Sequence, residues 1–181
     1  LEVEFFYDHE EYYKELKEKV EYLVHGQHYI SETKEMDNLT SGFALRTVDD
    51  IYTYSEYLVD AMESGHFNVF AHPDLYMCGY KEFDEHAEKV AHIICKKAEE
   101  TNSILEYNGN GYRRGATMTP LGIQPLYPRI EFWNIVKTYN IKTILGSDCH
   151  SPEIMYDDTI KEAEEVYQKL GVKYIEFLDI K

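Results

Sequence analysis

Short apolar segments alternate with longer helix-like segments along the whole chain, and this alternation limits the folds open to it. No Asn-Gly or similar hairpin signal lies between two apolar runs. Alternation of this kind predicts a parallel sheet, either a (β/α) barrel or an open doubly wound sheet. The expected strands are 1–7, 22–24, 67–71, 103–107, 142–145 and 173–178, and the expected helices are 9–20, 48–62, 83–98, 128–136 and 152–170.

The size and charge of the chain exclude several classes of function. Its 181 residues, 44% of them hydrophobic, predict a single domain over residues 1–181. The net charge of −16 repels phosphate backbones, so we expect no extended nucleic acid as a partner. No apolar stretch approaches the roughly 20 residues that span a bilayer, so no membrane association is expected. The cysteines Cys78, Cys95 and Cys149 lack paired spacing, which indicates a reducing, cytoplasmic setting.

The chain begins directly with residues that are typical of a strand. The chain has no initiator Met and opens inside the predicted strand at Leu1. We therefore expect that residues preceding Leu1 belong to the intact protein.

Polar side chains occur within or just after several predicted strands. Glu2 lies in the first, His28 follows the second and His72 ends the third, where Pro73 favours an extended backbone. Sites of parallel α/β proteins lie at the carboxyl ends of strands. Mixed imidazole and carboxylate donors suit Zn, Fe or Mn. The pattern predicts a divalent metal site at this edge of the sheet.

A second pair of donors follows the strand at 142–145. Asp148 and His150 are two residues apart, so an extended backbone would point both side chains to one spot. Ser151 and Pro152 then predict the start of a helix. Cys149 between them faces the other way and is expected to pack in the core.

Each of these residues has an alternative, purely structural interpretation. A single His after a strand is commonly a surface residue. Glu4 shares the face of Glu2 and is expected to be structural. Five further histidines lie in polar or helical surroundings and are expected at the surface: His9, His25, His66, His86 and His92.

A glycine-rich loop follows the strand at 103–107. Its spacing is GxGxxxG over residues 109–115, and the prolines beyond it exclude the helix that a dinucleotide loop requires. The loop instead carries Arg113 and Arg114, either of which could bind an anion through its guanidinium. The alternative is that both arginines are solvated.

Several segments together resemble one known superfamily over nearly the whole chain. The chain is identified as similar to the PHP (polymerase and histidinol phosphatase) superfamily, and most of all to stand-alone histidinol-phosphate phosphatases. The segments 71–75 (AHPDL) and 146–152 (GSDCHSP) are the most specific. The others, in order, are 1–4 (LEVE), 24–30 (VHGQHYI), 105–108 (LEYN), 111–113 (GYR) and 127–128 (YP).

The resemblance implies a fold and a site. The fold would be a distorted (β/α)7 TIM-like barrel, incomplete at its N-terminus because the opening HxH strand of the family has no counterpart here. The site would hold up to three divalent metal ions. By position, Glu2 would bridge metals and Arg113 would contact the substrate phosphate, with His28, His72, Asp148 and His150 as further ligands. Asp148 and His150 are also the residues expected to be catalytic.

The activity implied by the resemblance is hydrolysis of a small phosphorylated substrate. L-histidinol phosphate, hydrolysed in histidine biosynthesis, is the first candidate, and the chain alone is expected to bind fewer metals and to turn over weakly or not at all. A nucleotide phosphoesterase or 3′–5′ exonuclease is the second, with long nucleic acids disfavoured by charge. The third is a non-catalytic metal-binding fragment. Oligomeric state stays open.

Overall fold

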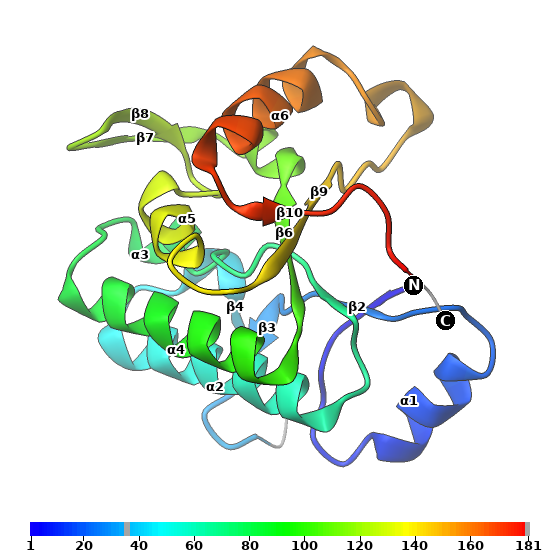
Figure 1. Ribbon diagram of the computed structural model, residues 1–181. Helices are drawn as coiled ribbons and strands as arrows, with labels where there is room; N and C mark the ends of the chain where they lie inside the picture. Colours follow the sequence, from blue (N-terminus) through cyan, green and yellow to red (C-terminus); the bar gives the residue numbers. More distant parts are fainter. Residues whose placement is uncertain (35–36, 180–181) are drawn as a thin grey trace.

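The computed structural model describes residues 1–34 and 37–179 and shows a mixed α/β fold around one parallel sheet (Figure 1). The strands lie in the order β1-β2-β5-β6-β9-β10, and each neighbouring pair is parallel. They are β1 (Glu2–Val3), β2 (Val24–His25), β5 (Val69–Phe70), β6 (Ile104–Asn108), β9 (Lys142–Gly146) and β10 (Lys173–Tyr174). The parallel α/β prediction is confirmed. Within the described residues the sheet is open, because β1 and β10 stand at opposite ends of this order.

Helices connect the strands and cover the sheet. The α-helices are α1 (Glu10–Lys17), α2 (Val48–Ser64), α3 (Met77–Tyr80), α4 (Glu85–Thr101), α5 (Ile130–Val136) and α6 (Asp158–Leu170). Helices α2 and α4 run side by side, and α5 packs on α4 (Figure 1). Large side chains from these helices, including Tyr54 and Trp133, are fully buried with Phe70 and Leu105 of the sheet. In the described part of the chain, no helix is both long and apolar enough to cross a membrane.

An antiparallel hairpin lies within residues 109–127, where the glycines and prolines predict a loop. Strands β7 (Ala116–Thr119) and β8 (Gly122–Pro125) pair antiparallel inside the segment expected as a loop. The Thr119 hydroxyl accepts a hydrogen bond from the Leu121 N–H (3.0 Å) and donates one to the Gly122 carbonyl (3.0 Å). This side chain closes the turn without the Asn-Gly pair that signals hairpins. A smaller antiparallel pair joins β3 (Tyr29–Ile30) to β4 (Thr40–Ser41).

The last helix begins later than its sequence predicts. Ser151 makes no side-chain capping bond, and only a 3₁₀ turn, η3 (Pro152–Ile154), follows it. Helix α6 begins at Asp158, where the Asp157 carboxylate accepts the N–H of Ile160 (3.1 Å). Asp157 therefore provides the cap that the sequence analysis placed at Ser151.

Helix α2 begins with a capping box, the pattern that Thr47 followed three residues later by Asp50 predicts. The Thr47 hydroxyl accepts the Asp50 N–H (3.1 Å), and the Asp50 carboxylate accepts the N–H groups of Thr47 (2.9 Å) and Arg46 (2.8 Å). Burial alone would raise the pKa of Asp50, but these hydrogen bonds outweigh it, and the pKa lies below its ordinary 3.8.

Stability of the chain should report this box directly. Thr47→Ala is expected to lower the free energy of unfolding by about 1 kcal/mol in urea denaturation at neutral pH.

Because the folded-state pKa of Asp50 is depressed, the contribution of Asp50 to stability is present above pH 3.8 and is lost as the pH falls below that value. The stability difference between the unmodified chain and Asp50→Asn should therefore shrink below pH 3.8. Asp49→Asn is the matched control, since Asp49 shares the first turn of α2. Equal losses from Asp50→Asn and Asp49→Asn would contradict the capping role.

Candidate metal centre

Three of the five predicted ligands converge at one spot. Glu2 comes from β1, His28 from the segment after β2, and His72 from the segment after β5. One donor atom from each lies within 4.8 Å of the other two. The Glu2 Oε1 atom is 3.7 Å from His28 Nε2 and 4.0 Å from His72 Nε2. Residues far apart in the sequence thus present a carboxylate and two imidazoles to a common point.

Gly26 makes room for this cluster. A Cβ atom at Gly26 would lie 2.4 Å from Glu2 Oε1, closer than real contacts allow, and 3.0 Å from His28 Cε1, which is a tight contact. Only glycine at this position lets the Glu2 carboxylate lie over the end of β2.

Glu4 holds His28 in place. Its Oε1 atom accepts the N–H groups of His28 (2.8 Å) and Tyr29 (2.6 Å), and its Oε2 atom is 3.7 Å from His28 Nδ1. The interaction with Glu4 is the main cause that raises the pKa of His28. The expectation that Glu4 is structural agrees with these contacts, which resemble the carboxylate–imidazole support common around metal ligands.

His72 is held rigidly through its backbone. Its φ of +34° contradicts the extended backbone expected before Pro73. Such a conformation costs about 1–3 kcal/mol and persists only where surrounding contacts enforce it. Here the His72 carbonyl accepts from Leu75 N (2.9 Å) and Tyr54 Oη (3.3 Å), and the His72 N–H donates to Glu106 Oε2 (3.3 Å).

The imidazole of His72 is neutral, so one of its ring nitrogens can donate a lone pair to a metal ion. Burial lowers the pKa of His72 to about 3, and its Nδ1 atom has no hydrogen-bond partner among the described residues. A neutral ring offers a lone pair, as metal coordination requires. The set of one carboxylate and two imidazoles therefore fits a divalent cation such as zinc.

Asp148 and His150 lie outside the group of three. Burial is the main cause that raises the pKa of Glu2; the charge of Asp148 raises it further, and that of His150 lowers it. Asp148 has a φ of +43°, so the extended geometry expected to align it with His150 is wrong. The Asp148 carboxylate accepts Asn110 Nδ2 (3.0 Å), while His150, with its side chain 67% exposed, turns its Nδ1 toward the Asp148 carbonyl (3.0 Å). In this structure they border the cluster rather than complete it.

Glu106, in β6, was not predicted as a site residue. Its Oε2 atom accepts Asn108 Nδ2 (2.9 Å), and a Cβ atom at Gly146 would lie 1.7 Å from its Oε1. Burial, aided by the charges of Glu2 and Asp148, raises the pKa of Glu106 to about 7. A carboxylate inside the apolar run 103–107, spaced two residues from an Asn, is the sequence signal that could have revealed it.

Two histidines expected at the surface are buried instead. His25 packs against Phe67 and Phe70, with ring centroids 5.1 and 5.2 Å away, and burial lowers its pKa to about 3. His66 is buried with its Nε2 atom 2.7 Å from the Glu10 carboxylate. Both positions depend on contacts between segments distant in sequence, which polar local surroundings do not reveal.

Arg113 contacts protein groups rather than open space. Its Nη2 atom donates to the Asp157 carboxylate (2.6 Å) and to the Ile154 carbonyl (3.3 Å). In this conformation the guanidinium ties the glycine-rich loop to the start of α6.

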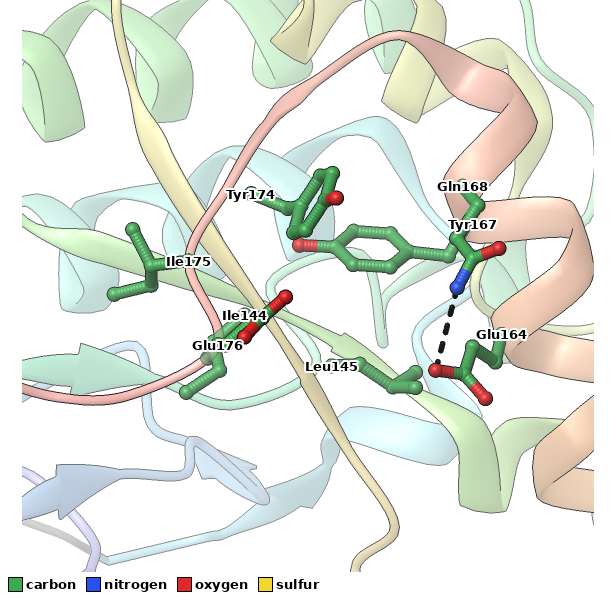
Figure 2. Close-up of a pocket in the computed structure, with 8 residues that line it drawn as sticks. All are labelled: Ile144, Leu145, Glu164, Tyr167, Gln168, Tyr174, Ile175 and Glu176. Carbon is green, nitrogen blue, oxygen red and sulfur yellow. Dashed lines mark hydrogen bonds between the residues drawn. The ribbon is translucent and has the colours of Figure 1, made fainter.

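A separate hollow of about 310 Å³ lies between β9, α6 and the segment after β10 (Figure 2). Tyr167 and Tyr174 line it, and Glu164 and Glu176 give it an acidic wall. Carboxylates repel a phosphate dianion, so this hollow is unsuited to a phosphorylated substrate. It also contains none of the predicted ligands.

Comparison with the sequences of known protein families and of curated proteins finds no match. Among solved structures, the chain is similar to a histidinol phosphate phosphatase from Lactococcus lactis, crystallised with zinc, L-histidinol and phosphate. The TM-score is 0.69 at 15% sequence identity, over 97% of this chain and 66% of that one. The likeness establishes a shared fold across the part of the phosphatase that the chain spans.

The supporting role of Glu4 predicts a change in metal affinity. Glu4→Gln removes the charge beside His28 Nδ1, and zinc should bind about 10- to 100-fold more weakly in calorimetric titration of the full chain. Glu11→Gln, on the exposed side of α1, is the matched control and should leave zinc affinity unchanged. Equal zinc affinity in the two variants would show that Glu4 does not support the ligand.

Proposed function

We propose that the chain is a metal-dependent phosphomonoesterase whose metal ligands are Glu2, His28 and His72, joined by Asp148 and His150. The convergence of a carboxylate and two imidazoles at the carboxyl edge of the sheet carries this proposal. The shared fold with a zinc-containing phosphatase supports it. A distorted (β/α)7 barrel with up to three divalent metals is part of the same proposal.

The residues divide into holding and positioning roles. Glu2, His28 and His72 would hold a divalent ion, which when bound stabilises negative charge on phosphate oxygens as a Lewis acid. Glu4 fixes the ring of His28, and Asn110 fixes the carboxylate of Asp148. Pre-organisation of this kind avoids rearrangement when charge develops during the reaction.

L-histidinol phosphate is the substrate we propose. The phosphatase with the same fold was crystallised with L-histidinol and phosphate, the two products of that hydrolysis. The net charge of −16 favours a small substrate over an extended nucleic acid. We further propose a cytoplasmic setting and a role in histidine biosynthesis.

A substrate panel on the full chain tests this function. With added Mn²⁺ or Zn²⁺, the chain should release phosphate weakly from L-histidinol phosphate, yet faster than from a nucleoside monophosphate or single-stranded DNA, and a chelator should abolish the release. His28→Ala should lower kcat/KM by more than about 100-fold, beyond the usual cost of losing a supporting group. His92→Ala is the matched control, because the exposed His92 contacts Tyr139 away from the cluster. Metal-independent turnover, or equal activity of the two variants, would contradict the proposal.

A further inference from the structure

The guanidinium of Arg114 packs on an aromatic ring, Phe43, that neighbours the metal centre. Arg114 follows the 3₁₀ turn η2 (Gly109–Arg113) and is exposed. Its Cζ atom is 5.4 Å from the centroid of the Phe43 ring. Phe43 in turn lies 6.2 Å, ring to ring, from His28. The Phe43 ring therefore neighbours both the Arg114 guanidinium and a predicted metal ligand.

Tyr127 connects the same guanidinium to His72. Its ring lies 6.4 Å from Phe43 and 6.0 Å from His72. Burial raises the pKa of Tyr127, and the charge of Arg114 and a side-chain hydrogen bond with it oppose that rise. The charge of Arg114 also contributes to the lowered pKa of His72, after burial and His28. Arg114 is thus electrostatically close to the buried ligand.

The two neighbouring arginines differ in their partners. The charge of Arg113 is compensated by Asp157 at 2.6 Å. Among residues 1–34 and 37–179, Arg114 has no carboxylate in ion-pair contact. An uncompensated cation beside a group of carboxylates, in a chain of net charge −16, is available to an incoming anion.

We propose that Arg114, rather than Arg113, binds the phosphate group of the substrate. This inference rests on the proposed phosphatase function and names a specificity residue for it. Glu2, Glu106 and Asp148 would repel a phosphate dianion, so a fixed guanidinium at the rim lowers the cost of its approach. The planar fork binds two phosphate oxygens at once, and the face of Phe43 holds it in position.

The competing explanation is that Arg114 only packs on Phe43. Lys89 provides a matched control, because its Nζ atom lies 5.5 Å over the ring of Tyr52 without contact to the metal centre. Arg114→Met and Lys89→Met each remove one exposed cation from an aromatic face while keeping an apolar stem. Arg114→Lys keeps the charge but loses the fork.

The experiment measures binding of inorganic phosphate to the Mn²⁺-loaded full chain by calorimetry, together with kcat/KM for L-histidinol phosphate. Arg114→Met should weaken phosphate binding and lower kcat/KM on the order of 10- to 100-fold, as expected for losing hydrogen bonds to a charged group. Arg114→Lys should fall between Arg114→Met and the unmodified chain. Lys89→Met should change either value by no more than about twofold.

The outcomes separate this inference from the function beneath it. If the unmodified chain binds phosphate and hydrolyses the substrate, and Arg114→Met has the same phosphate affinity and kcat/KM as Lys89→Met, the role of Arg114 alone is overturned. If Arg113→Met loses phosphate binding at an unchanged unfolding midpoint while Arg114→Met keeps it, Arg113 and not Arg114 binds the phosphate. If the unmodified chain binds neither Mn²⁺ nor phosphate, the phosphatase function and the Arg114 role are overturned together.

Discussion

Negative charge gathered at one edge of the sheet is the constraint on which the rest of the structure depends. Burial raises the pKa of Glu2 and that of Glu106, and the charge of Asp148 raises both. Buried like charges are costly unless a cation or hydrogen-bond donors compensate them. The neighbouring His72 is neutral and supplies a lone pair instead of a charge. A divalent cation is the partner that satisfies carboxylates and neutral imidazoles at once.

The scaffold maintains this arrangement against the preference of its own backbone. Left-handed conformations at His72 and Asp148 are unfavourable for residues with side chains. Glycines at positions 26 and 146 remove the Cβ atoms that would collide with Glu2 and Glu106. Strain and close approach therefore coincide with the candidate ligands, as is common where a fold pre-organises a site. Helix α2 contributes through the buried Tyr54, whose hydroxyl donates a hydrogen bond to the His72 carbonyl.

The sequence could predict the fold class and the core of the site because both depend on simple periodicity. His28 and His72 follow apolar strands, and parallel strands bring their carboxyl ends to one edge. The geometry of Asp148 could not be predicted, because its φ of +43° departs from the extended backbone that alternation along a strand assumes. Glu106 could be singled out only as a carboxylate inside an apolar strand, and that signal does not say that its side chain lies beside Glu2 and Asp148. The burial of His25 likewise depends on aromatic side chains more than forty residues away.

Anomalous diffraction at the zinc edge, from crystals of the full chain grown with Zn²⁺, tests the central claim most directly. The account predicts a zinc peak at about 2.0–2.2 Å from a Glu2 carboxylate oxygen and from one ring nitrogen each of His28 and His72. Zinc found only at other surface groups, with these three side chains well ordered and unligated, would contradict it.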